Sequence, residues 1–254
     1  MGGKYQLTKL LLVRGLLGAY MPGHFKRVQS HFRELGFAVE IAPTLPHGTL
    51  FQNAKRLRRY LDAETSNRLA ILAHSKGGIE TLLALRDLGR PVQSVVLMQT
   101  PRRGAPYLSS VFRKAQPRPS SSLKRLREST HGLGLTAIGA RAACLEIATK
   151  DYLPGVEEIE KTNYPFPIYS FSSFSKHNSN WVELQAGRID ELEPGKLNDG
   201  VFLTQDQVWS GFRHKELDFE LDHAEPTVGS ARIHEPSLWE NLLRENEILP
   251  ELSR

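Results

Sequence analysis

The chain contains a single cysteine, Cys144, so no disulfide can form within it. It also lacks any apolar run near the roughly 20 residues that a membrane-spanning helix needs. The apolar stretch at residues 10–13 is too short for the hydrophobic part of a secretory signal. We therefore expect a protein without membrane spans that works in a reducing cytoplasm, or outside the cell if a leader has been removed.

The chain also lacks a strong excess of positive or negative charge. The net charge is +5, because 33 Lys and Arg residues are opposed by 28 Asp and Glu residues. The densest basic stretch, residues 102–127, has no nucleic-acid-binding module around it, and we interpret it as solvated surface. We expect no nucleic-acid partner.

Segments typical of strands and helices alternate along the first hundred residues. Apolar runs predict strands at 7–13, 37–42, 69–73 and 92–98, and helical spacing of apolar residues recurs at 25–35, at 50–61 and after residue 75. This alternation predicts an α/β fold, a mainly parallel sheet with helices on both faces. A further strand is expected at 165–174 and a closing helix near residues 238–243, whereas 175–197 shows no clear pattern.

Residues 101–163 interrupt this alternation. The first part, 101–122, is rich in Pro, Ser and Arg, and the rest is helical in part. A compact domain rarely contains so long a connection unless it has a function. We therefore expect one domain over residues 1–254, with 101–163 inserted as a cap or wall of a pocket.

The strand at 69–73 leads directly into Ser75, within the segment Ala-His-Ser-Lys-Gly at 73–77. Small residues around a serine at this point are typical of a nucleophile elbow, a strained strand-to-helix turn that exposes the serine hydroxyl above the sheet. The alternative is that Ser75 only caps the following helix, since serine is a preferred N-cap residue. The elbow requires two partners later in the chain, an acid and then a histidine.

Both partners are present in that order. An Asn-Asp-Gly turn occupies 198–200, and His223 lies near the carboxyl end. With these features the chain resembles the α/β-hydrolase superfamily, and more narrowly its small bacterial lipases and esterases. The segment Thr-Pro-Arg-Arg-Gly at 100–104 is similar to a Thr-Pro-His-x-Gly stretch of those lipases. The resemblance implies an α/β-hydrolase fold with a helical cap insertion.

The resemblance also implies roles for single residues. Asp199 would orient His223, and His223 would act as general base toward Ser75. Three acids compete with Asp199: Asp190, Glu193 and Asp206. His214 is the first rival of His223, while His131, His177 and His234 are interpreted as surface residues. His74 is a poor base, because adjacent side chains on a strand point apart.

The segment Val-Arg-Gly-Leu-Leu-Gly at 13–18 matches the turn that supplies an oxyanion-hole amide in such lipases, with Arg14 in place of the usual histidine. The backbone amides of Leu16 and Lys76 would be the two donors. Glu225 lies where some lipases carry a calcium-binding carboxylate. No partner carboxylate is evident upstream, so we predict neither a metal nor a cofactor.

These features predict a serine hydrolase that cleaves carboxylic esters, an esterase or lipase acting on a small-molecule ester or lipid through an acyl-enzyme intermediate. An acyltransferase or amidase would use the same three residues. A catalytically silent binding protein is the alternative from another class, because a fold does not fix a function.

Overall fold

A computed structural model describes residues 9–66, 68–86, 88, 92–105, 107–108, 141–176 and 182–249. Six strands form one sheet in the order β2-β1-β3-β4-β5-β6, and every neighbouring pair is parallel. The strands are β1 (Lys9–Val13), β2 (Ala38–Ile41), β3 (Leu69–His74), β4 (Ser94–Met98), β5 (Ile168–Ser172) and β6 (Arg213–Glu216). The predicted parallel α/β sheet is confirmed.

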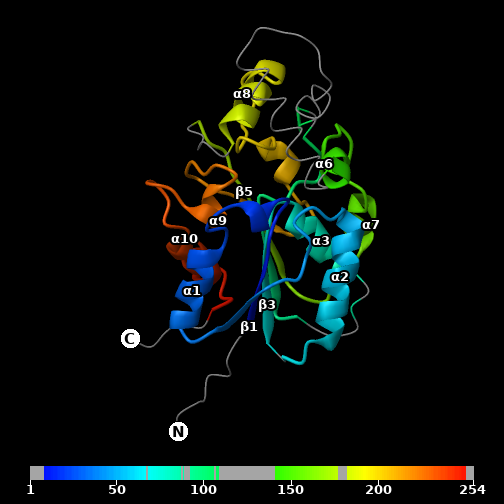
Figure 1. Cartoon of the computed structure of the whole chain (residues 1–254), viewed down its shortest axis with the longest axis vertical. Helices are drawn as coiled ribbons and strands as arrows, with labels where there is room; N and C mark the ends of the chain where they lie inside the picture. Colours follow the sequence, from blue (N-terminus) through cyan, green and yellow to red (C-terminus); the bar gives the residue numbers. More distant parts are fainter. Residues whose placement is uncertain are drawn as a thin grey trace.

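Helices cover both faces of this sheet (Figure 1). On one side lie α1 (Lys26–Glu34) and α10 (Glu235–Glu245), and on the other α2 (Leu50–Ala63), α3 (Lys76–Leu85) and α7 (Val156–Lys161). Toward the top of the view lie α6 (Arg141–Ile147) and α8 (Glu183–Leu192). Among the described residues, the short elements are α9 (Glu225–Val228) and two 3-10 turns, η1 (Gly18–Tyr20) and η2 (Thr204–Gln207).

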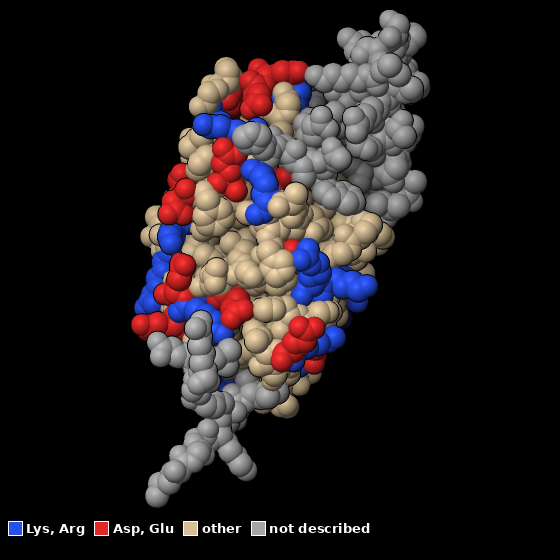
Figure 2. Space-filling view, turned by 90° about the vertical axis from the view of Figure 1, so that its left-hand side faces the viewer, with Lys and Arg blue, Asp and Glu red and all other residues tan. Residues whose placement is uncertain are grey.

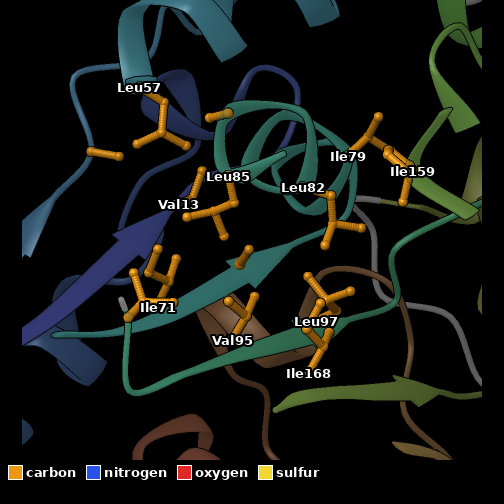
Figure 3. Close-up of a cluster of buried hydrophobic side chains, with 14 of the residues drawn as sticks. Val13, Leu57, Ile71, Ile79, Leu82, Leu85, Val95, Leu97, Ile159 and Ile168 are labelled. Carbon is orange, nitrogen blue, oxygen red and sulfur yellow. The ribbon is translucent and has the colours of Figure 1, made fainter. Parts of the chain in front are cut away.

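Successive residues of the inner strands are buried in two different cores. In β1, Leu11 and Val13 belong to the cluster under α2 and α3, whereas Leu10 and Leu12 belong to the cluster under α1 and α10. Figure 3 shows the first cluster, in which side chains of α3 such as Leu82 lie over the sheet. Because both faces are covered, the inner strands are almost continuously apolar rather than alternating.

The observed elements follow the predicted pattern except at 175–197 and at 213–216, where the edge strand β6 was not predicted. The segment 175–197 contains α8, which the sequence did not reveal. Val182 at its N-cap, Ala186 and Ile189 are buried at positions i, i+4 and i+7, a short helical pattern that we did not recognise in the sequence. Within the expected insertion, α6 and α7 confirm partial helicity, while 109–140 lies outside the described residues.

On the side of the molecule formed by α1 and α10, acidic and basic side chains are interspersed (Figure 2). Glu240 of α10 illustrates this mixing, because it contacts both His31 and Arg244. Among the helices that the structure describes, none combines the length and apolar character needed to cross a bilayer.

Candidate active site

Ser75 occupies a strained turn between β3 and α3. Its backbone has φ 56° and ψ −133°, a conformation that residues other than glycine rarely adopt. Its N–H donates to the Met98 carbonyl at 2.9 Å, which ties the turn to β4. Its side chain makes no capping hydrogen bond to α3, contrary to the helix-cap alternative. The hydroxyl is therefore available for another partner.

The two glycines after Ser75 allow this turn to pack closely. A Cβ on Gly77 would lie 2.5 Å from the Arg14 carbonyl oxygen, and one on Gly78 would overlap the Thr100 side chain. Neighbours at such distances leave no room for a larger residue. The small residues expected around the serine thus have a steric cause in the structure.

His223, in the loop before α9, links the serine to the acid. Its Nε2 lies 2.8 Å from Ser75 Oγ, and its Nδ1 lies 2.7 Å from Asp199 Oδ2. All three residues are buried, Asp199 completely. The structure therefore brings together, in one hydrogen-bond chain, the serine, histidine and acid that the sequence order selected.

Four donors surround the Asp199 carboxylate. Oδ1 accepts from the backbone N–H groups of Val201 at 2.9 Å and Phe202 at 2.8 Å. Oδ2 accepts from Gln207 Nε2 at 3.0 Å as well as from His223. An ionised carboxylate only accepts hydrogen bonds, so the Nδ1 of His223 must donate. In a neutral ring this leaves Nε2 free to accept the Ser75 proton.

The rival acids have other partners. Glu193 pairs with Lys196 at 2.9 Å, and Asp190 accepts from the Asn198 side chain at 3.4 Å. Asp206 lies on η2, where burial raises the pKa of its carboxyl group. None of these contacts leads to a histidine.

The rival histidines also lie elsewhere. His214 on β6 is held between the hydroxyls of Ser170 and Ser172, each at 3.1 Å. His234 caps α10 and accepts from the Ser237 N–H at 3.4 Å. The other two rivals fall outside the described residues: His131 and His177.

His74, immediately before the nucleophile position, supports His223 by packing. The two ring centroids lie 4.8 Å apart. Gln99 Nε2 donates to Ser173 Oγ at 2.6 Å and to the Asp222 carbonyl at 3.0 Å, so its Oε1 accepts from His74 Nε2 at 3.1 Å. Burial holds the pKa of His74 well below its ordinary value, and its ring stays neutral. Sequence reasoning missed this pairing, which depends on contacts between distant segments.

The turn after β1 lies directly against the nucleophile position. A Cβ on Gly15 would lie 3.0 Å from Ser75 Cβ. The Leu17 N–H donates to the Pro46 carbonyl at 2.7 Å, which anchors this turn to the loop before α2. Within the described part of the chain, the N–H groups of Leu16 and Lys76 have no protein acceptor.

The side chain of Lys76 also binds the loop before α2. It is buried and donates to the Gly48 carbonyl at 2.8 Å, and it forms a short ion pair with Glu80. Asn53 Nδ2 donates to Glu80 at 2.8 Å and to the Leu45 carbonyl at 2.9 Å. Burial raises the pKa of Glu80 to about 7 in spite of the nearby ammonium group. The network connects α3 to the same loop that receives the turn after β1.

Glu225, at the position compared with a calcium-binding carboxylate, is engaged by donors of the chain itself. It accepts from the Asp222 N–H at 2.8 Å, from Ser230 Oγ at 2.6 Å and from Arg232 Nη2 at 2.9 Å. Among the described residues, no group of three or more His, Cys, Asp or Glu side chains is arranged to hold a metal ion. The role of Glu225 in this structure is to close the loop that carries His223.

The described start of the expected insertion packs against the acid loop. Tyr107 is buried in a cluster with Ile189 and Phe202. The ring centroid of Phe202 lies 5.2 Å from that of His223. The described start of residues 101–163 therefore shares a buried cluster with Phe202, whose ring contacts that of His223.

Comparison with known proteins places this architecture. By sequence, no known family and no curated protein matches the chain. By structure, it is similar to a metagenomic carboxyl esterase, with a TM-score of 0.65 and 22% identity over 98% of this chain and 78% of the esterase. A mature Bacillus licheniformis lipase gives a TM-score of 0.65 and 13% identity over 96% of this chain and 94% of the lipase. A lipase-esterase related protein from Clostridium acetobutylicum gives 0.54 and 11%, covering 96% of each chain. The six-stranded parallel sheet, its helices on both faces and these neighbours show that the chain has the α/β-hydrolase fold.

Proposed function

We propose that the protein is a serine hydrolase that cleaves carboxylic esters. One observation carries the proposal: Ser75 Oγ, His223 and Asp199 form an unbroken hydrogen-bond chain with separations of 2.8 and 2.7 Å. A nucleophile hydrogen-bonded to a base that is oriented by a third group defines this class of site by geometry. The structural neighbours named as esterases and lipases are consistent with it.

In the proposed mechanism, Ser75 Oγ attacks the ester carbonyl carbon while His223 Nε2 takes the hydroxyl proton. Asp199 holds the imidazole in the tautomer that can accept this proton and stabilises the imidazolium that results. The imidazolium then protonates the leaving alkoxide, which departs as an alcohol and leaves an acyl-serine. Water, deprotonated by His223, attacks the acyl-serine, releases the acid and restores Ser75.

The negative charge that develops on the carbonyl oxygen needs fixed donors. The backbone amides of Leu16 and Lys76 are proposed for this role, because Lys76 follows the serine, Leu16 follows Gly15, which packs against the serine, and neither N–H has a protein acceptor among the described residues. Removing one such donor typically lowers the rate by about 10²–10³. Residues 101–163 are proposed to border the acyl pocket, and the presence of Tyr107 and Phe202 in one buried cluster supports this.

The test is hydrolysis of p-nitrophenyl esters of increasing acyl length by the wild-type protein, Ser75→Ala and the surface control Ser237→Ala. We expect turnover by the wild type and the control and none by Ser75→Ala, whose circular dichroism should stay native. Product analysis in water with added alcohols separates hydrolysis from acyl transfer, and amide analogues identify an amidase. An active Ser75→Ala protein would overturn the proposal.

A further inference from the structure

Arg14 is a basic residue in the turn that packs against the nucleophile position. It follows β1 directly and precedes Gly15, the residue whose Cβ would lie 3.0 Å from Ser75 Cβ. Its own carbonyl oxygen packs against Gly77 of α3, where a Cβ would lie 2.5 Å away. The backbone of Arg14 is thus held between Gly77 of α3 and the neighbouring Gly15, which packs against Ser75.

The side chain of Arg14 lacks a compensating charge. It is partly exposed, and its Nε is shielded from solvent without a hydrogen-bond partner. No carboxylate of the described chain forms an ion pair with it, and burial alone lowers the pKa of its guanidinium. Taking a charged group out of water without a partner costs stability. An arginine kept in this state next to a proposed active site needs a reason other than folding.

The groups that surround Arg14 do not supply an anion. His24 lies beside it, since a Cβ on Gly18 would be 2.9 Å from His24 Nε2 and 3.0 Å from Arg14 Cβ. Burial, and then the charge of Arg14, lower the pKa of His24 to about 3, so its ring is neutral near pH 7. The Asp199 carboxylate of the proposed site is already engaged, since it accepts four hydrogen bonds. Within the described chain, the Arg14 guanidinium therefore has no anionic partner, and it belongs to a residue whose backbone packs against the turn at Ser75.

We propose that Arg14 binds an anionic oxygen group of the substrate, so that the preferred esters carry a carboxylate or a phosphate in addition to the bond that is cleaved. A guanidinium presents a planar fork of donors that matches such groups bidentately. The guanidinium N–H groups, for which the described chain offers no anionic partner, provide the contact. This inference rests on the proposed esterase function and adds the class of substrate.

The kinetic test compares matched esters. One pair is p-nitrophenyl valerate and the mono-p-nitrophenyl ester of glutaric acid, which have the same acyl length and differ in a terminal carboxylate. The second pair, a monoacylglycerol with and without a phosphate on its glycerol, places the anion on the alcohol side. We expect the wild type to prefer the anionic member of at least one pair by about tenfold or more in kcat/KM.

The variants are Arg14→Gln, Arg14→Lys and the control Arg58→Gln, which removes a surface arginine paired with Asp62. Arg14→Gln should abolish the preference, Arg14→Lys should keep part of it, and Arg58→Gln should leave it intact. An anionic-to-neutral ratio that is the same in the wild type and Arg14→Gln, for both pairs, would overturn the proposal. If Ser75→Ala were still active, the esterase proposal itself would fail, which is a separate outcome.

A binding measurement tests Arg14 without any turnover. Glutarate should raise the melting temperature of the wild-type protein, and neutral glutaramide should not. Arg14→Gln should lose the shift with glutarate, while its melting temperature without ligand should equal or exceed that of the wild type, since an unpaired charge has been removed. An equal shift in both proteins, or a strong destabilisation of Arg14→Gln, would show that the guanidinium has a structural role instead.

Discussion

Asp199 and His223 are joined by two hydrogen bonds, one between side chains and one between backbones. His223 Nδ1 lies 2.7 Å from Asp199 Oδ2, and the His223 N–H donates to the Asp199 carbonyl at 2.8 Å. The loop before η2 and the loop before α9 are therefore locked to each other at the residues whose side chains must align. The geometry of the proposed acid and base does not depend on the side-chain contact alone.

This double link makes Asp199→Asn an informative variant. The backbone bond should keep the protein folded, while the amide group cannot hold His223 in the Nδ1-protonated form. We expect kcat to fall by about 10⁴ for p-nitrophenyl esters, the size of effect known for a wrong tautomer at such sites. Asp206→Asn, which changes a nearby acid on η2, should stay close to the wild-type rate. The assignment of the acid is wrong if the two variants behave the other way round.

Gly77→Ala should damage both stability and activity. Its Cβ would meet the Arg14 carbonyl at 2.5 Å, a backbone atom that cannot move without shifting the turn against Ser75. We expect a loss of about 1–3 kcal/mol in the free energy of unfolding, measured in urea, together with a lower kcat/KM. Gly187→Ala in α8 is the matched control, since nothing lies within 4 Å of its Cβ. A gain of about 0.5–1 kcal/mol is expected there. Equal stabilities of the two variants would contradict the steric argument.

Removing only one charged side chain of the Lys76–Glu80 pair should lower the free energy of unfolding strongly. Lys76→Met leaves the buried Glu80 carboxyl without its cation, and loss of one partner of such a pair typically costs about 3–5 kcal/mol. The double variant Lys76→Met/Glu80→Leu removes both charges and should recover most of that loss. Urea unfolding of the wild type, Lys76→Met, Glu80→Leu and the double variant completes a double-mutant cycle. Additive losses would show that the two side chains do not depend on each other.

His24 should make the protein sensitive to acid. Burial lowers the pKa of His24 to about 3, whereas in the unfolded chain it returns to its ordinary value near 6.5. Between these values the unfolded state binds more protons, so this contribution to stability is complete above pH 6.5 and is lost as the pH falls toward 3. Glu80, with a pKa raised to about 7, acts in the opposite direction between pH 4.5 and 7.

A variant of His24 isolates its contribution to the pH dependence of stability. His24→Gln should make unfolding free energy less sensitive to pH below 6.5, because its own titration is removed. The measurement is urea unfolding of wild type and variant at several values between pH 4 and 7, which cover most of that range. A variant whose loss of stability on acidification matches the wild type would contradict the assigned cause.

Most strands of the sheet and the order of the candidate site residues could be predicted from the sequence. Strands buried on both faces, such as residues 69–74, give continuous apolar runs, and the order of Ser75, Asp199 and His223 selects three residues that meet in one hydrogen-bond chain. Contacts between distant segments were not predictable. Gln99 reaches His74 only after β3 and β4 pair, and Glu80 meets Asn53 only when α2 packs on α3.

Reaction with a fluorophosphonate probe tests the central claim most directly. The probe forms a covalent bond only with a serine that is activated by its neighbours. Mass spectrometry of the wild-type protein should find one adduct, on the peptide that contains Ser75, and Ser75→Ala should carry none. His223→Gln should stay folded and react far more slowly. An unlabelled wild-type protein, or an adduct on another serine, would contradict Ser75 as the nucleophile.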